Sequence, residues 1–196
     1  MASKSYHLII VESPSKATTL KKFLGEKYLV EASVGHIRDL PKSDLGIDPE
    51  NKFKTKYVQT ISKENLKKLK SALSSASTLY LATDPDREGE AIAWHLVELL
   101  KPTIPIKRLV FHEITKDAIL DSFNHTRDID QDLVNAQETR RVIDRLLGYP
   151  VSNKIWTNVS RGLSAGRVQS PAIKIVVDRE KERSKFVKSE YWSVSA

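Results

Sequence analysis

Carboxylates occupy every second position at Asp84, Asp86 and Glu88, inside the stretch TLYLATDPDREGEAIAWHLVELL at residues 78–100. In a segment that is not helical, such side chains project to the same side and repel one another unless a cation neutralises them. Mg²⁺ prefers hard oxygen ligands and completes its shell with water and phosphate oxygens. The spacing therefore indicates a Mg²⁺ site. The alternative is a simple helix cap, because acidic residues are common in a first helical turn.

A strand followed by a helix is expected to position these carboxylates. The apolar run at residues 79–82 predicts the strand, and Pro85 ends it because proline has no amide hydrogen. From Gly89 onward, apolar residues recur at intervals of three and four, which predicts a helix that Pro102 stops. The carboxylates therefore fall at the junction between the two elements.

The first part of the chain repeats this alternation of strand and helix. Further strands are predicted at residues 7–11, 29–34 and 108–111. A further helix is predicted to end at Leu24, a second to run from a Ser62 cap to about residue 75, and a third to begin after a Thr115 cap. Residues 38–60 look irregular. The pattern predicts an α/β fold, a parallel sheet with helices on both faces.

The polar residues that could do chemistry follow the ends of these strands. Glu12, His36, the segment 84–88 and Glu113 each come just after one predicted strand. In open α/β sheets, ligands bind outside the carboxyl ends of the strands. We therefore expect these residues at one edge of the sheet, which favours the metal site over a simple cap.

The character of the chain changes at the polar connection 124–130. A long helix is predicted over residues 130–147, ended by Gly148 and Pro150. The segment SRGLSAGRVQS at residues 160–170 combines glycines, hydroxyls and arginines, which suit phosphate contacts, although a plain loop between helices is the alternative. A helix is expected from Ser170 as N-cap to about residue 185, and a strand over residues 190–196.

Composition sets broad limits on function. The chain has 196 residues, 40% of them hydrophobic, with a net charge of +7, which suggests a polyanionic partner. It has no cysteine, which excludes disulfides and thiolate metal sites. No apolar run approaches the length of a membrane span, so a soluble protein is expected.

Six segments of the chain together resemble the N-terminal part of bacterial type IA DNA topoisomerases, in the topoisomerase I branch. The matching segments are LIIVESPSKA (8–17), ASVGHIRDLP (32–41), LATDPDREGEAIAWHL (81–96), RLVFHEIT (108–115), RRVIDRLLGY (140–149) and RGLSAGRVQS (161–170). They occur in the family's order and cover nearly the whole chain. The resemblance implies a Toprim domain at residues 6–115, a linker at 116–129, and the beginning of the cleavage and strand-passage body at 130–196.

The resemblance also implies roles for individual residues. Glu12 would lie next to the scissile phosphate with Lys16, and Asp144 would act in cleavage near the nucleotide that precedes the break. Glu12, Asp84, Asp86 and Glu88 would hold Mg²⁺. The residues expected to contact DNA are His36, Arg108, Arg140, Arg141, Arg145, Ser164, Ala165, Gly166, Arg167, Val168, Gln169 and Ser170.

The implied reaction is a transesterification that cuts one strand of negatively supercoiled DNA and reseals it without ATP. A tyrosine hydroxyl attacks a phosphate of single-stranded DNA and forms a 5′-phosphotyrosine. None of the six tyrosines here stands in the family's context, so the nucleophile is expected in a missing C-terminal part. Pro171 also departs from the family pattern. The implied protein is a monomer in the bacterial cytoplasm, associated with the nucleoid.

Two other readings remain open from the sequence. One is a Toprim nuclease or a primase-like protein, against which RGLSAGRVQS argues. The other is a DNA-binding module that retains a metal site without catalysis. The resemblance favours part of a topoisomerase that is inactive in relaxation by itself.

Overall fold

The computed structural model describes residues 6–195 and divides the chain into two compact units, residues 1–142 and 143–196. The division falls inside the long helix α5 (Gln131–Asn158). Unit 1 contains all the strands, and unit 2 consists of the second part of α5, the helix α6 (Gln169–Lys185) and the segments that follow them.

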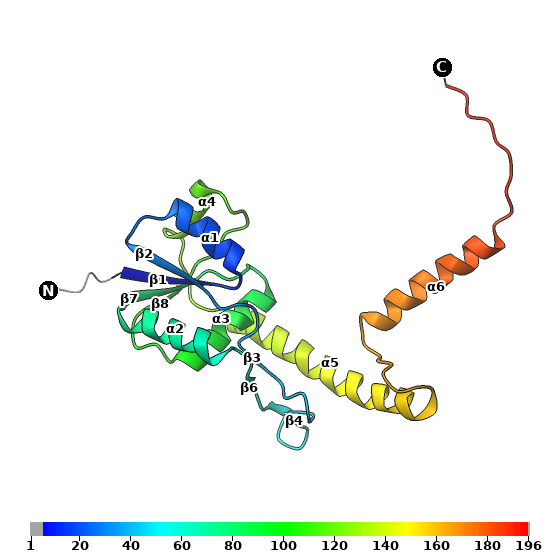
Figure 1. Cartoon of the computed structure of the whole chain (residues 1–196), viewed down its shortest axis with the longest axis horizontal. Helices are drawn as coiled ribbons and strands as arrows, with labels where there is room; N and C mark the ends of the chain where they lie inside the picture. The colour runs from blue at the N-terminus through cyan, green and yellow to red at the C-terminus, as the bar shows by residue number, and fades with distance from the viewer. Residues whose placement is uncertain (1–5, 196) are drawn as a thin grey trace. The chain divides into compact units, whose positions relative to one another are not determined.

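Four parallel strands form the sheet of unit 1, in the order β2-β1-β7-β8 (Figure 1). They are β1 (Tyr6–Val11), β2 (Tyr28–Ala32), β7 (Ala76–Leu81) and β8 (Ile106–Arg108). The predicted parallel sheet is therefore confirmed. Val11 of β1 is in register with Ala32 of β2, and Ile10 with Leu81 of β7, so the carboxyl ends of three strands come together.

Helices cover both faces of this sheet (Figure 1). The helices α1 (Pro14–Phe23) and α4 (Lys116–Ser122) lie on one face, and α2 (Lys63–Ser74) and α3 (Arg87–Leu100) on the other. Alternate residues of β1 enter the two apolar layers, Ile9 on the α1 side and Leu8 on the α2 and α3 side.

The helix caps follow the sequence. The side chains of Ser62 and Thr115 accept hydrogen bonds from the amides of Asn65 and Ala118, so both predicted caps are confirmed. The predicted bounds of the fourth strand are wrong, because β8 ends at Arg108, where the prediction began. The apolar residues Leu109 and Phe111 are buried against the α1 side of the sheet without being strand residues.

Residues 36–61 form an extension between β2 and α2. Two antiparallel pairs of two-residue strands structure it: β3 (Arg38–Asp39) pairs with β6 (Val58–Gln59), and β4 (Ile47–Asp48) with β5 (Lys54–Thr55). The rest of the extension is irregular, as predicted.

Unit 2 departs from the prediction at three places. Helix α5 passes through Gly148 and Pro150 and continues to Asn158, because one proline removes only one hydrogen bond of the helix. Helix α6 begins at Gln169 after Val168, which makes no side-chain cap, so the predicted Ser170 cap is wrong. Residues 190–195 have no regular structure, so the predicted strand is wrong there; its last residue, Ala196, lies outside the described residues.

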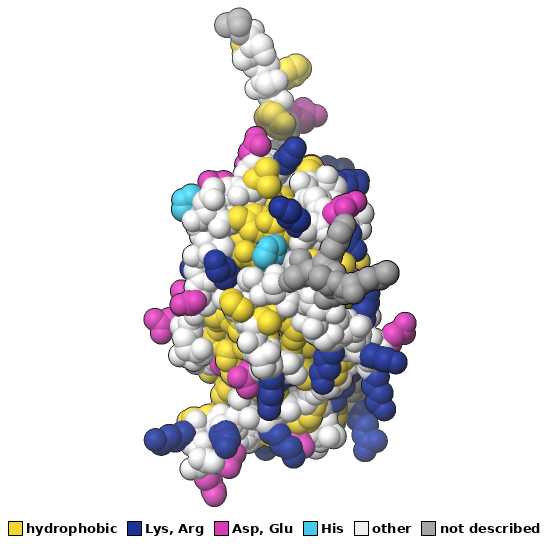
Figure 2. Space-filling view, turned by 90° about the vertical axis from the view of Figure 1, so that its left-hand side faces the viewer, with side chains coloured by type: hydrophobic (Ala, Val, Ile, Leu, Met, Phe, Trp, Pro, Cys, Tyr) yellow, Lys and Arg dark blue, Asp and Glu magenta, His cyan; other side chains and the backbone are white. Residues whose placement is uncertain are grey.

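The surface carries mixed side chains. Figure 2 shows lysines and arginines spread among apolar and uncharged side chains on one face. None of residues 143–195 is buried, and large apolar side chains such as Ile175 and Trp192 are 70% and 93% exposed. Among residues 6–195, no helix is both long and apolar enough to cross a membrane.

Candidate functional site

Lys16 stands between two carboxylates at the carboxyl edge of the sheet. Its ammonium lies 3.1 Å from Glu12 Oε1 and 2.9 Å from Asp84 Oδ1. Glu12 follows β1, Asp84 follows β7, and Lys16 comes from the first turn of α1, which Ser13 caps. The lysine side chain is only 6% exposed and lies 5.0 Å from the ring centre of Phe111, so its charge is held away from water. The structure thus brings Glu12, Lys16 and Asp84 together.

The acidic turn at residues 84–88 is folded tightly onto the start of α3. Asp86 is the N-cap of α3, and its Oδ1 accepts the amide of Gly89 at 2.7 Å. A Cβ on Gly89 would lie 2.2 Å from the carbonyl oxygen of Asp84, so only glycine allows this approach. Thr83 Oγ1 donates to the carbonyl of Gly89 at 2.6 Å. Asp86 therefore has a capping role whether or not it also binds a metal.

His36 joins the same edge from the loop after β2. Its Nε2 lies 3.1 Å from Glu88 Oε1, and both side chains are more than half exposed. The amide of Gly35 donates to the carbonyl of Glu12 at 2.9 Å, which fixes this loop beside the acidic turn. The predicted gathering of Glu12, His36 and residues 84–88 at one sheet edge is confirmed. Glu113 is exposed, and Thr115 Oγ1 donates to it.

The carboxylates supply hard oxygen donors but not a closed cage. Within residues 6–195, no three histidine, aspartate or glutamate side chains are close enough to hold a metal together. Asp84 is 59% exposed and Asp86 is exposed, and the buried Oε2 of Glu12 has no hydrogen-bond partner. This donor set fits a Mg²⁺ ion that keeps water or phosphate ligands.

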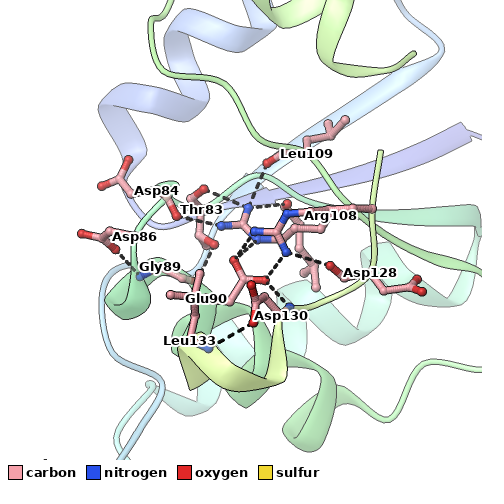
Figure 3. A network of polar contacts seen from close by, with 12 residues as sticks. Thr83, Asp84, Asp86, Gly89, Glu90, Arg108, Leu109, Asp128, Asp130 and Leu133 are labelled. Atoms are coloured by element: carbon pink, nitrogen blue, oxygen red, sulfur yellow. Dashed lines mark hydrogen bonds and ion pairs between the residues drawn. The ribbon is translucent and has the colours of Figure 1, made fainter. Parts of the chain in front are cut away.

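Arg108 does not lie where the sequence placed it. It was expected to contact DNA, but its side chain is 0% exposed. Its guanidinium donates to Glu90 and to the carbonyls of Leu81, Thr83, Asp84 and Leu109 (Figure 3). The expectation for Arg108 is therefore wrong: it supports the acidic turn from inside the fold.

Glu90, which is buried, and Arg127, which is partly exposed, complete that cluster and were missed from the sequence. Glu90 is 0% exposed and accepts hydrogen bonds from Arg108, from both terminal nitrogens of Arg127, and from the amide of Asp130. Burial alone would raise the pKa of Glu90, but the Arg127 and Asp130 hydrogen bonds and the arginine charges hold it below its usual range. A carboxylate among the buried residues of α3 was the available signal, since such charges are buried only when paired.

A small pocket lies between α3, the extension and the beginning of α5. His95 is buried there, and its Nδ1 has no hydrogen-bond partner. Burial, followed by the charges of Arg38 and His36, lowers the pKa of His95 to about 4, so the ring is neutral at pH 7. Tyr57 Oη donates to Glu138, and burial together with this carboxylate raises the pKa of Tyr57.

The other arginines of unit 1 that were expected to contact DNA are Arg140 and Arg141, both on α5. Arg141 forms a two-pronged ion pair with Asp39 of the extension, with Nε 3.0 Å and a terminal nitrogen 2.6 Å from Oδ1. Burial would raise the pKa of Asp39, but the Arg141 hydrogen bond and charge keep it below its usual range. The side chain of Arg141 is 44% exposed.

Unit 2 contains the remaining predicted site residues. Arg167 pairs with Asp144 through Nε at 2.7 Å and a terminal nitrogen at 3.1 Å. The guanidinium of Arg145 lies 4.3 Å from the ring centre of Tyr149. The segment 164–170 is exposed or partly exposed and is held by Ser164 Oγ donating to Gln169 and by the amide of Ala165 donating to Ser152. Gly166, Val168 and Ser170 lie in or beside this turn at the start of α6.

Comparison with protein families divides the chain into two matched regions. Residues 7–114 match the family described as "Toprim domain", and residues 128–196 match the family described as "DNA topoisomerase". The first match covers more than half of the chain. The chain therefore belongs to the Toprim family. Its second region is similar to a DNA topoisomerase family.

The curated relatives that the chain resembles include bacterial DNA topoisomerases. The chain is 54% identical to DNA topoisomerase 1 of Streptomyces coelicolor and 50% identical to that of Synechococcus elongatus, over 96% of its own length. It spans only 21% and 23% of these relatives. The solved structure of full-length topoisomerase I from Thermotoga maritima is similar with a TM-score of 0.78 and 45% identity, over 92% of this chain and 31% of that one.

Proposed function

We propose that this chain is the metal-binding and part of the DNA-binding region of a type IA DNA topoisomerase. The observation that carries the proposal is the Glu12–Lys16–Asp84 cluster at the carboxyl edge of a Toprim sheet, in a chain whose remaining residues match a DNA topoisomerase family. The larger enzyme would relax negatively supercoiled DNA by cutting and resealing one strand. The proposed domains are residues 6–115 and 130–196, with a linker at 116–129.

Asp84, Asp86 and Glu88, with Glu12 nearby, would hold Mg²⁺. The ion would supply positive charge that orients a DNA phosphate and offsets its negative charge. Lys16 already pairs with two of the carboxylates, and its fixed ammonium would stabilise charge that develops on a phosphate at the same edge.

Single-stranded DNA would contact the basic and small residues of both units. The side chains of His36 and Arg141 are partly exposed, and Arg140 lies on the same helix as Arg141. In unit 2 the contacts would come from Arg145 and residues 164–170, with Asp144 acting near the cleavage site. Arginine side chains and backbone amides are the usual phosphate partners.

The nucleophilic tyrosine would come from another part of the larger enzyme. The tyrosines of unit 1 are engaged elsewhere: Tyr6 Oη donates to the carbonyl of Ala72, and Tyr57 Oη donates to Glu138. Tyr28 and Tyr80 both pack on Phe123. These contacts support a division of labour in which this chain binds metal and DNA but does not form the covalent bond.

The metal assignment is tested by calorimetric titration of Mg²⁺ into the chain. The double variant Asp84→Asn/Asp86→Asn removes both charges, while asparagine at position 86 still caps α3. Loss of Mg²⁺ binding in this variant is expected. Asp117→Asn, an exposed aspartate in the first turn of α4, is the control and should bind as wild type does. Equal Mg²⁺ binding by the double variant would refute the assignment.

The DNA assignment is tested by the salt dependence of binding to single-stranded DNA. Arg141→Gln should weaken binding to all sequences alike and reduce the salt slope by about 1, because one phosphate contact is lost. An unchanged affinity and salt slope would show that Arg141 of α5 does not contact DNA. DNA nicking or primer synthesis by this chain would instead favour the nuclease or primase-like reading.

A further inference from the structure

The cluster of the buried Arg108 and Glu90 with the partly exposed Arg127 has no part in the proposed chemistry (Figure 3). We propose that Arg108 is a positioning residue: it fixes the backbone that presents Asp84, and Glu90 connects that backbone to the start of α5. The proposal rests on the proposed function only in treating Asp84 as part of the Mg²⁺ site.

Arg108 is bound almost entirely to backbone carbonyls at the end of the sheet. One terminal nitrogen donates at 2.9 Å to each of Leu81, Thr83 and Leu109, and the other donates at 2.7 Å to Asp84. These carbonyls lie where β7 and β8 stop. A planar guanidinium has five donors in a fixed arrangement, so it sets the direction of each carbonyl it binds.

Asp84 is therefore held from two sides. Arg108 binds its carbonyl, and the first turn of α3 approaches so closely at Gly89 that a Cβ there would lie within 2.8 Å of three backbone atoms of Asp84. Once the carbonyl and the amide of a residue are fixed, its carboxylate can search only a few rotamers. The position that Asp84 offers to a cation thus depends on a side chain that no cation touches.

Glu90 extends the same arrangement to residues 127–130. Its two oxygens accept hydrogen bonds from Arg127 and from the amide of Asp130, as well as from Arg108. Backbone hydrogen bonds also join Arg108 and Arg127, at 2.8 and 3.2 Å. Asp130 Oδ1 in turn accepts the amides of Asp132 and Leu133 at the beginning of α5. The acidic turn and the start of the helix that carries Arg141 therefore share one carboxylate.

Stability alone does not explain this cluster. Replacing a complete buried ion pair by apolar side chains is often neutral or stabilising, whereas removing one partner leaves an uncompensated charge. A lysine at position 108 could still pair with Glu90 but could not direct four carbonyls. The change Arg108→Lys thus separates charge pairing from backbone positioning.

The test measures hydrogen exchange at the amides of residues 84–90, together with Mg²⁺ titration, in the folded chain. In Arg108→Lys, the Gly89 and Glu90 amides, which donate to Asp86, should exchange faster, and Mg²⁺ affinity should fall about tenfold, as for other outer partners of metal ligands. The matched control is Arg127→Lys. It disturbs the same carboxylate, but the side-chain hydrogen bonds of Arg127 in the described structure go to Glu90 and Asp128 and not to the acidic turn, so both readouts should stay as in wild type.

If Arg108→Lys does not fold, the double variant Arg108→Met/Glu90→Met removes both charges together and should show the same two changes. Wild-type exchange and affinity in a folded Arg108 variant would overturn the proposal. It would also be overturned if both single variants changed in proportion to their loss of thermal stability. A wild-type chain that binds no Mg²⁺ would refute the metal assignment, while the exchange measurement would still decide the role of Arg108.

Discussion

Lys16 shows how one residue makes an acidic site compatible with folding. Its single ammonium pairs with both Glu12 and Asp84 from a largely buried position and reduces their mutual repulsion, so the two carboxylates can approach without a bound cation. Because one ammonium faces two carboxylates, the cluster keeps a net negative charge that attracts a cation to this edge. A single residue can therefore determine the charge at the site.

His95 should make the stability of the chain depend on pH. Its pKa is lowered from 6.5 to about 4 by burial first, and then by Arg38 and His36. Because the folded-state pKa is the lower one, its contribution is complete above pH 6.5 and is lost as the pH falls to 4. The loss is expected to reach about 3 kcal/mol.

Urea unfolding between pH 4 and 7 measures this contribution. His95→Phe should flatten the pH dependence in that window, whereas His112→Phe, at an exposed histidine, should leave it unchanged. Glu138 lies 3.8 Å from His95 Nε2 and has its pKa raised by burial, so its contribution has the opposite sign. An unchanged pH profile in His95→Phe would contradict the assignment.

Gly89 should tolerate no side chain. A Cβ would lie 2.2 Å from the Asp84 carbonyl oxygen, so Gly89→Ala must displace the acidic turn, and we expect a loss of about 2 kcal/mol in unfolding free energy with weaker Mg²⁺ binding. Gly148 in α5 is the matched control. A Cβ there meets only the carbonyl of Ala165 at 3.6 Å, so Gly148→Ala should stabilise the helix by up to about 1 kcal/mol. Equal effects at both positions, measured by thermal unfolding, would contradict the close packing at Gly89.

At the scale of elements, the extension between β2 and α2 acts on α5 through the Asp39–Arg141 ion pair. The carboxylate occupies the two-pronged position that a phosphate would take on Arg141. Asp39→Asn should therefore release Arg141 and tighten single-stranded DNA binding by up to about fivefold, the range of a partly exposed ion pair.

The control for this change is Asp48→Asn, which removes the same charge from β4 of the extension without affecting Arg141. Fluorescence anisotropy at several salt concentrations compares the two variants. If both tighten DNA binding equally, the effect reflects net charge and not competition for Arg141.

The sequence predicts the elements of unit 1 well because each has a local cause. The buried strands correspond to apolar runs in the sequence, and Ser62 and Thr115 mark the starts of the helices that they cap. The convergence of Glu12, His36 and the acidic turn follows from the parallel topology. The gathering of these residues could be predicted without knowing the order of the strands, because parallel strands place their carboxyl ends at the same edge of the sheet.

The errors arise where tertiary contacts override local signals. Arg108 lies at the end of a strand, near the edge where the other site residues gather, yet it is buried because it pairs with Glu90 and Arg127, which are 18 and 19 residues away. The end of α5 was predicted from Gly148 and Pro150, but neither residue is sufficient to stop a helix whose other hydrogen bonds remain. The ion pair of Asp39 with Arg141 joins residues 102 positions apart and has no local signature.

At the scale of the whole molecule, the chain spans about a fifth of its curated relatives, and we expect it not to relax supercoiled DNA. Relaxation requires a nucleophile held in line with a phosphate, and the tyrosines of unit 1 are bound elsewhere. A relaxation gel with Mg²⁺, read beside a denaturing gel for DNA-linked protein, measures this. Relaxation that disappears on changing one of the chain's own tyrosines to phenylalanine would contradict the proposed division of labour.

The boundary between the units also bears on how such a protein is made. Every strand of the sheet lies before residue 142, and Val134 of α5 is fully buried in unit 1, so this core is complete early in the chain. A polypeptide that emerges from the ribosome N-terminus first could close this core while later residues are still being synthesised. Residues 143–195 bury none of their own side chains and have no core to close at that stage. In a longer enzyme the acidic site would thus be folded before the body that works with it exists.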